Sequence, residues 1–566
     1  MTPQNPQISN PQHPKIQPLL KRTPQKIILD TSKNFQRYSK YNSKTSKAIT
    51  NIPEKIQSFY TERIQDVIKI AKAQDSFSKF CYVVATKRAF QQEFFHANLK
   101  KFFHLSSLDL QIHHNNTPKV LFKTLSALKN LTHLTIGLKF FLLQDPKVIR
   151  LLFKKLQTLN KLTSLTISLS LCLDFRGPDL EIFSSNLTLL TQLSSLKLIL
   201  DRTIQFDDNS LIKLASDLQR LTRLTQVQID FGEGKKIQGP TLLKLFTSFR
   251  TLKALSDIRI NLGHSQLVNE NAREYLSESL LCLDVPSIRK LSLHFYQNFM
   301  SDSLVKISKA LKKFSSLEAL SLNFFACSNI ANAGVAELSS SLRELTSLSS
   351  LNVDFASSVN VEFLIRDVAA ALKSLNKLVY LKLDLQRKEK TTNEQVQLLF
   401  TGLKALAYLR FLDMNLSFLN CLSDATMKSL SESLKELIFL QNLTLNFTCT
   451  NVISSTGVEA LSNSIKGLTR LSLLNLNIAY NENIDEKAMN AIAEALDCLP
   501  DLYSVSLSVN RCAKLVENDG GLANLFRILI KKGSIIDVHL SLTQNEVNKQ
   551  GIDSLEKRKN LSCYWL

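Results

Sequence analysis

The chain has 566 residues, with 70 Lys and Arg against 49 Asp and Glu, and a formal net charge of +21. No apolar run approaches the roughly 18 residues of a membrane span, and the polar, proline-rich start lacks the apolar core of a secretory signal. Nine cysteines without a C-x-x-C pair indicate reduced thiols, not a disulfide framework or a metal site. We therefore expect an intracellular protein, cytoplasmic or nuclear and open to cytoskeletal association, that is not secreted.

Residues 1–50 contain six prolines and a Ser/Lys/Asn stretch, a composition typical of disorder. Positive charge is concentrated in this end of the chain, because residues 1–100 hold 17 Lys and Arg against 6 Asp and Glu. Aromatic residues Phe35, Tyr38 and Tyr41 lie among these cations, which suits single-stranded nucleic acid or an acidic polymer surface. We define the basic arm as Lys21, Arg22, Lys26, Lys33, Arg37, Lys40, Lys44 and Lys47.

Residues 51–102 change to a helical apolar pattern followed by a group of aromatic residues. We expect this segment to be an N-terminal helical cap that closes the open end of a repeat array. A separate binding module is the alternative.

Residues 103–545 repeat one apolar template, L-x-x-L-x-L-x-L, fifteen times, and nine of the fourteen spacings between copies are 31 residues. A fixed period in this range indicates a solenoid. We number each repeat from its first leucine-type residue, position 0, and call that residue the anchor. The anchors are Leu105, Leu131, Leu162, Leu193, Leu224, Leu255, Ile288, Leu317, Leu348, Leu378, Leu409, Leu440, Leu471, Leu502 and Ile535.

Each repeat also has a helical half, because apolar residues fall at −10, −6 and −3, as in Leu338, Leu342 and Leu345. Residues that begin helices stand ahead of this half, among them Asp208, Ser423 and Asp485. Positions 0, +3, +5 and +7 give the strand an inward apolar face. We therefore predict an α/β solenoid, a curved horseshoe of about 15 β-α units with a parallel inner sheet and outer helices. Residues 546–566 should form a C-terminal cap.

The repeat resembles the leucine-rich repeat family, in its long, ribonuclease-inhibitor-like form. Strands of the Leu-Asn-Val-Asp-Phe type and helices such as 334–338 (GVAEL) and 457–461 (GVEAL) carry the resemblance. The family usually places Asn or Cys at +8 to bond the loop backbone, whereas +8 here has no consensus. The resemblance therefore implies the fold and a protein-binding role, and the family's loop geometry is not expected to transfer.

The exposed strand positions +4 and +6 form a small, polar, mildly acidic face. Its Asn and Asp side chains either offer amide and carboxylate groups to a partner or hydrogen-bond one another along the sheet. Tyr296 and His294, with Phe325, are its bulky cluster. The candidate partner-binding residues of this face are Asp230, Asn261, His294, Tyr296, Asn323, Asp354, Asp384, Asp413, Asn415, Asn446 and Asn477.

A second column holds cations in the last turn of the predicted helices. A cation there is favoured by the helix dipole, which is one explanation, and a continuous row would also attract nucleic acid, acidic tails or anionic membrane. We call this set the basic stripe: Arg250, Lys312, Arg343, Lys373, Lys404, Lys435 and Lys466. Four further cations precede anchors, namely Lys161, Arg223, Lys377 and Arg470.

No phosphate-binding, dinucleotide-binding, zinc-protease or nucleophile-elbow motif is present in the sequence. We expect a non-enzymatic protein-binding or scaffold protein without a cofactor or metal, and a subunit of a larger assembly. One alternative is a nucleic-acid or ribonucleoprotein-associated factor that uses the basic arm and basic stripe. Another is a regulator of an enzyme, either ribonuclease-inhibitor-like or GTPase-activating.

Overall fold

The computed structural model describes most residues of the repeat array. The described residues are 27–30, 79–84, 105–113, 122–123, 125–139, 147–172, 175–202, 207–232, 237–263, 270–283, 286–297, 303–358, 363–388, 391–450, 452–515, 520–542 and 562–565. The chain divides into two units, Met1–Ser168 (unit 1) and Leu169–Leu566 (unit 2).

Unit 1 contains a ladder of parallel strands. Each strand pairs with the next in the chain, so that β1 pairs with β2, β2 with β3, β3 with β4 and β4 with β5. The elements are β1 (Ile27–Asp30), β2 (Lys79–Val84), β3 (Ser107–His113), β4 (His133–Lys139), α5 (Lys147–Leu156) and β5 (Ser164–Ser168).

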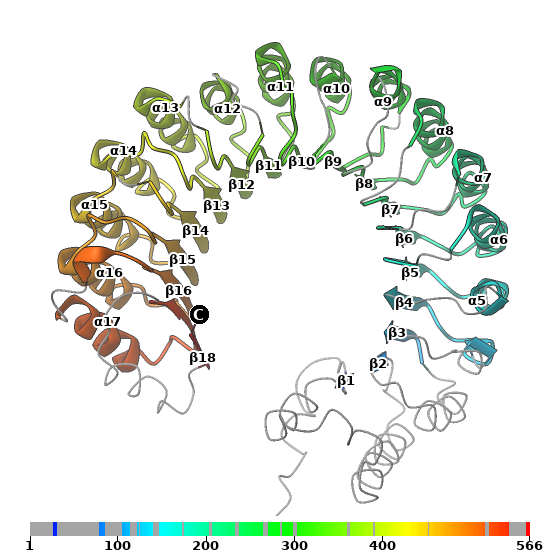
Figure 1. Ribbon diagram of the computed structural model, residues 1–566, viewed down its shortest axis with the longest axis horizontal. Coiled ribbons are helices and arrows are strands. Elements are labelled where there is room, and N and C mark those ends of the chain that lie inside the picture. The colour runs from blue at the N-terminus through cyan, green and yellow to red at the C-terminus, as the bar shows by residue number, and fades with distance from the viewer. Residues whose placement is uncertain are drawn as a thin grey trace, which may run out of the picture. The chain divides into compact units, whose positions relative to one another are not determined.

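Unit 2 alternates helix and strand from α6 to β17, with the helices on the outer side of a curved parallel sheet (Figure 1). Its strands are β6 (Ser195–Ile199), β7 (Gln226–Asp230), β8 (Asp257–Asn261), β9 (Lys290–His294), β10 (Ala319–Asn323), β11 (Ser350–Asp354), β12 (Tyr380–Asp384), β13 (Phe411–Asn415), β14 (Asn442–Asn446), β15 (Leu473–Asn477), β16 (Ser504–Ser508), β17 (Asp537–Ser541) and β18 (Ser562–Trp565). Its helices are α6 (Gly177–Leu187), α7 (Asp208–Leu218), α8 (Gly239–Arg250), α9 (Glu270–Cys282), α10 (Ser303–Leu311), α11 (Asn332–Glu344), α12 (Leu364–Leu372), α13 (Asn393–Leu403), α14 (Asp424–Leu434), α15 (Ser455–Ile465), α16 (Glu486–Asp497) and α17 (Gly520–Lys531), with a 3-10 turn at Ala513–Leu515.

The fifteen predicted repeats correspond to strands β3–β17, which alternate with helices α5–α17. The pairing register sets each residue opposite the same position of the neighbouring repeat, as in Leu351 beside Leu381. The predicted α/β repeat fold is therefore confirmed. Register is fixed because a slip by one residue would turn every apolar side chain toward water.

The core lies between the sheet and the helices. All fifteen anchors are buried, and in most repeats so are the helical positions −10, −6 and −3, such as Leu430, Leu434 and Leu437. Position +7 adds large aromatic side chains, with Phe324 stacked between Phe295 and Phe355 at centroid distances of 5.5 and 4.9 Å. Each repeat thus buries its apolar face only against its neighbours, as expected of a solenoid.

Two of the predicted helix-start residues, Ser423 and Asp485, cap their helices as expected. Ser423 accepts a hydrogen bond from the backbone N–H of Thr426, and Asp485 accepts one from Lys487. Helix α7 is capped one residue earlier than predicted, by Asp207. Asp208 instead accepts hydrogen bonds from the Thr241 hydroxyl (2.6 Å) and the Gln238 N–H (3.2 Å) of the next repeat.

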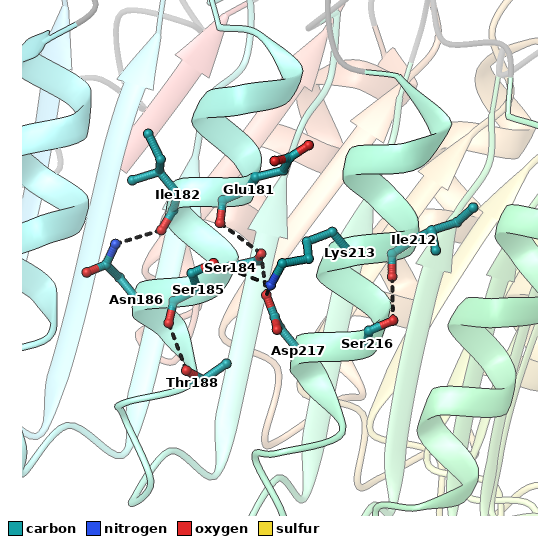
Figure 2. Close-up of polar contacts among 10 residues, drawn as sticks. All are labelled: Glu181, Ile182, Ser184, Ser185, Asn186, Thr188, Ile212, Lys213, Ser216 and Asp217. Atoms are coloured by element: carbon teal, nitrogen blue, oxygen red, sulfur yellow. Dashed lines mark hydrogen bonds and ion pairs between the residues drawn. The ribbon is translucent and has the colours of Figure 1, made fainter.

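Neighbouring helices are joined by polar contacts among small side chains. Between α6 and α7, the Ser184 hydroxyl donates to Asp217 over 2.7 Å, and Lys213 reaches the same carboxylate at 2.5 Å (Figure 2). Further along, the Ser341 hydroxyl donates to the Ser308 carbonyl (2.7 Å). Small side chains at these contacts let the outer helices approach each other.

Replacing Asp217 with alanine should lower the free energy of unfolding by about 1–2 kcal/mol, since a nearly buried carboxylate loses a serine hydroxyl and a lysine as partners. Urea unfolding followed by circular dichroism measures this. The control is Glu181→Ala, because Glu181 is exposed on α6 and should change stability by less than about 0.5 kcal/mol. Equal effects of the two substitutions would contradict a role for the Asp217 contacts.

Two short strands lie inside the segments predicted as arm and cap. Residues 27–30 form β1 and residues 79–84 form β2, which pair in parallel. The remainder of residues 1–102 lies outside the described residues, and disorder and a helical cap stay predictions there. In the predicted C-terminal cap, β18 extends the sheet by pairing with β17.

Candidate functional site

The sheet face of unit 2 is built from the strand positions that alternate with the buried ones. In β7 and β10–β15 positions +2, +4 and +6 are half-exposed and positions +3 and +5 are buried. Strand register stacks the +6 residues into one column along the sheet. The structure brings together in that column the predicted residues Asp230, Asn261, His294, Asn323, Asp354, Asp384, Asn415, Asn446 and Asn477.

Two predicted residues lie beside this column. Asp413 belongs to the +4 column, where its carboxylate pairs with the Lys382 ammonium at 2.9 Å. Tyr296 follows β9 in the loop, where its ring lies so close to Gly263 that a Cβ there would be 2.1 Å from Cε1.

Most +6 side chains accept a hydrogen bond from the backbone just after the end of their strand. The Oδ1 atom of Asn323 accepts the N–H of Phe325 at 2.9 Å, and Asp354 accepts that of Ala356 at the same distance. Asn261, Asp384, Asn415, Asn446 and Asn477 repeat this bond to the residue two places on. Cross-strand bonds join Asn261 to Asp230, Asn323 to Asp354 and Asn415 to Asp384. The column therefore has a structural role, and its partner-binding role stays a prediction.

Burial dominates the electrostatics of this column. Burial, and then repulsion from Asp384, raise the pKa of Asp354 to about 6, and burial also raises the pKa values of Asp384 and Asp230. Burial lowers the pKa of His294. Near pH 6 the carboxyl groups of this column therefore carry less negative charge than they would at their ordinary pKa values.

Two hollows open on the sheet face of unit 2. The first has a volume of about 360 Å³ and spans β7–β11, with small side chains at Ser292, Ala319, Ser321 and Ser350. Arg259 borders it and is held by Asp257 through two hydrogen bonds of 2.9 and 2.8 Å. The second has a volume of about 290 Å³, spans β12–β15 and is lined by Asn, Thr and Asp side chains.

A buried polar ladder at position +10 was missed in the sequence. In four repeats the +10 side chain donates to the +7 carbonyl of the preceding repeat. These donors are Cys327, Lys388, Asn481 and Cys512, and Thr450 donates to the +7 carbonyl of its own repeat. In these repeats the side chain that bonds the loop backbone therefore stands at +10, two residues after the +8 position to which the family resemblance assigns this role.

The backbone conformation explains why this ladder occurs at +10, two residues later than +8. The residue before it, at +9, has a left-handed φ between 51° and 60° in ten repeats, including Ala326, Ser357 and Tyr480. This left-handed turn directs the side chain at +10 into the core, next to the end of the strand. Residue types at +10 vary from Cys to Lys, so only their regular spacing of about 31 residues could have revealed them.

The basic stripe lies at the C-terminal ends of the helices, as predicted. Lys373, Lys404, Lys435 and Lys466 are C-cap residues, and Arg250 and Arg343 lie in the last turns of α8 and α11. Lys312 follows α10 and pairs with Glu337 (3.0 Å) and Glu344 (3.2 Å), and Lys466 pairs with Glu494 (2.9 Å). The residues of the basic arm lie outside the described residues.

A further row lies one position before the anchor, and of its members the sequence analysis named the two cations but not the two aromatic residues between them. Lys377, Tyr408, Phe439 and Arg470 occupy the same turn in four consecutive repeats of unit 2. We call these four residues the aromatic row. The signal that could have found them is their spacing, 31 residues each time.

The fold defines a β-α repeat protein. No family model matches the sequence, and no curated protein matches it either. Within the described ranges, no group of three or more His, Cys, Asp or Glu side chains could hold a metal ion, and no helix is long and apolar enough to cross a membrane.

Proposed function

We propose that this chain is an intracellular, non-enzymatic leucine-rich repeat protein that binds a protein partner on the sheet face of unit 2, as a scaffold or subunit of a larger assembly. The observation that carries the proposal is the hollow of about 360 Å³ over β7–β11. A hollow beside a charged rim gives a partner side chain a place to insert.

The chemistry around the hollow supports a protein partner. Its floor of serine and alanine accepts an apolar or polar side chain, and Arg259 is already oriented by Asp257, so binding would not have to order a flexible arginine. Arginine is enriched among residues that dominate protein interfaces. The carboxylates of the +6 column are engaged in strand-end hydrogen bonds, which favours a supporting over a catalytic role.

Thiol chemistry supports the intracellular assignment. Seven cysteines of the described residues are thiols outside any disulfide, and burial raises the pKa of Cys512 to about 11. Reduced thiols are usual in the reducing interior of a cell.

Filling the hollow should abolish partner binding. Ser321 lies at position +4 of β10 within the hollow, so Ser321→Trp would occupy it with an indole. Affinity purification with mass spectrometry should show partners of the wild-type protein that are lost with this variant. The matched control is Asn463→Trp on the exposed side of α15, which should keep them. Identical partners for all three proteins, with equal thermal stability, would exclude docking in the hollow.

A further inference from the structure

Three members of the aromatic row, Tyr408, Phe439 and Arg470, form a stack of planar groups at one edge of unit 2, in the turns that lead from helix to strand. The Tyr408 and Phe439 rings are 6.4 Å apart between centroids and within 20° of parallel. The Arg470 guanidinium lies 4.7 Å from the centroid of the Phe439 ring. Tyr408 remains 63% exposed, so one planar surface of the stack faces solvent.

Cations surround this stack. Lys377 and Arg470 occupy its two ends, and Lys404, Arg410 and Lys435 are exposed in the same turns. Lys377, Lys404, Arg410 and Lys435 form no ion pair with the described part of the chain. The four turns that hold the row contain a single acidic residue, Glu436. The edge is therefore strongly positive.

Helix dipoles account for only part of this arrangement. Lys404 and Lys435 are C-cap residues and gain from the dipole. Lys377 and Arg410 lie beyond the helix ends, and no dipole explains an exposed tyrosine stacked on a phenylalanine. The combination of unpaired cations with an open aromatic surface needs a second explanation.

We propose that the aromatic row and its neighbouring cations bind single-stranded nucleic acid. A base would stack on Tyr408, and Lys377, Lys404, Arg410 and Lys435 would neutralise phosphates on either side. Base–aromatic stacking beside a positive track is how sequence-tolerant single-strand binders hold their ligand. An acidic peptide would use the cations but not the ring. This edge differs from the hollow on the sheet face, so the inference goes beyond the proposed function.

Fluorescence anisotropy of a labelled 20-nucleotide oligo(U) or oligo(dT) against the full chain tests the proposal. Tyr408→Ala should weaken binding about tenfold, because stacking of one base contributes about 1–3 kcal/mol. Lys404→Glu should weaken binding and flatten its dependence on salt. The matched controls are Phe325→Ala, an exposed ring outside the row, and Lys428→Glu on α14, and both should bind as the wild type does.

Because every variant retains residues 1–50, the basic arm contributes equally in each comparison. Unchanged binding by Tyr408→Ala would overturn the proposal and assign any oligonucleotide binding to other cations. Tyr408-dependent binding to anionic phospholipid vesicles or to a poly-glutamate peptide, without oligonucleotide binding, would overturn it as well. Ser321→Trp should leave oligonucleotide binding intact, so failure here and failure of the sheet-face proposal are distinguishable.

Discussion

Replacing Phe324 with alanine should lower the free energy of unfolding of the chain by about 4 kcal/mol. The side chain is fully buried at position +7 and stacked between Phe295 and Phe355, at centroid distances of 5.5 and 4.9 Å. Truncation removes its transfer free energy and leaves a cavity between two aromatic rings, which together cost about 3–5 kcal/mol for a core phenylalanine. Loss of aromatic stacking adds to this. The shift in the urea midpoint measures the effect.

The next residue provides a matched control. Phe325 is 38% exposed, and its structural bond is made by its backbone N–H to Asn323, which alanine keeps. Phe325→Ala should therefore change the free energy of unfolding by less than about 1 kcal/mol. A similar loss of stability in both variants would mean that position +7 does not fill the core as the structure describes.

The fold could be predicted because the same residue types recur at fixed positions of every repeat. Leucine-type residues at fixed positions mark buried sites, and the anchor of every repeat is buried. The cap residues Ser423 and Asp485 were also predictable, since only short polar side chains satisfy the first N–H groups of a helix. Hydrophobic period and capping chemistry are local properties, so one sequence is enough to find them.

The features that were missed depend on three-dimensional contacts between repeats. The +10 ladder uses Cys, Asn and Lys for one hydrogen bond, so residue type does not announce the role of Cys327, Asn481 or Lys388. The aromatic row is equally hidden, because an exposed turn tyrosine such as Tyr408 is unremarkable until its ring is seen against Phe439. The strands β1 and β2 lie in segments whose sequence predicted disorder and a helical cap.

The chain should become more stable, relative to a Lys388→Met variant, as the pH rises from 7.5 to 10. Lys388 is 3% exposed and its ammonium donates to the Phe355 carbonyl and to the carbonyl and hydroxyl of Ser358 at 2.6–2.9 Å. Burial lowers its pKa from 10.5 to about 8. Between these values the unfolded chain binds more protons than the folded one, so stability rises with pH.

The expected gain between pH 7.5 and 10 is about 2 kcal/mol, which is part of the roughly 3.5 kcal/mol that the full fall of about 2.5 pKa units is worth at about 1.4 kcal/mol per unit. Unfolding by urea at the two pH values, in both proteins, isolates the Lys388 contribution because other titrating groups cancel. Methionine is a suitable replacement, since the same position of the next repeat is the buried Leu419. Asp354, whose pKa of about 6 is raised by burial, titrates below this window. Equal gains in both proteins would place the ammonium in water and contradict its burial beneath the β11 and β12 loops.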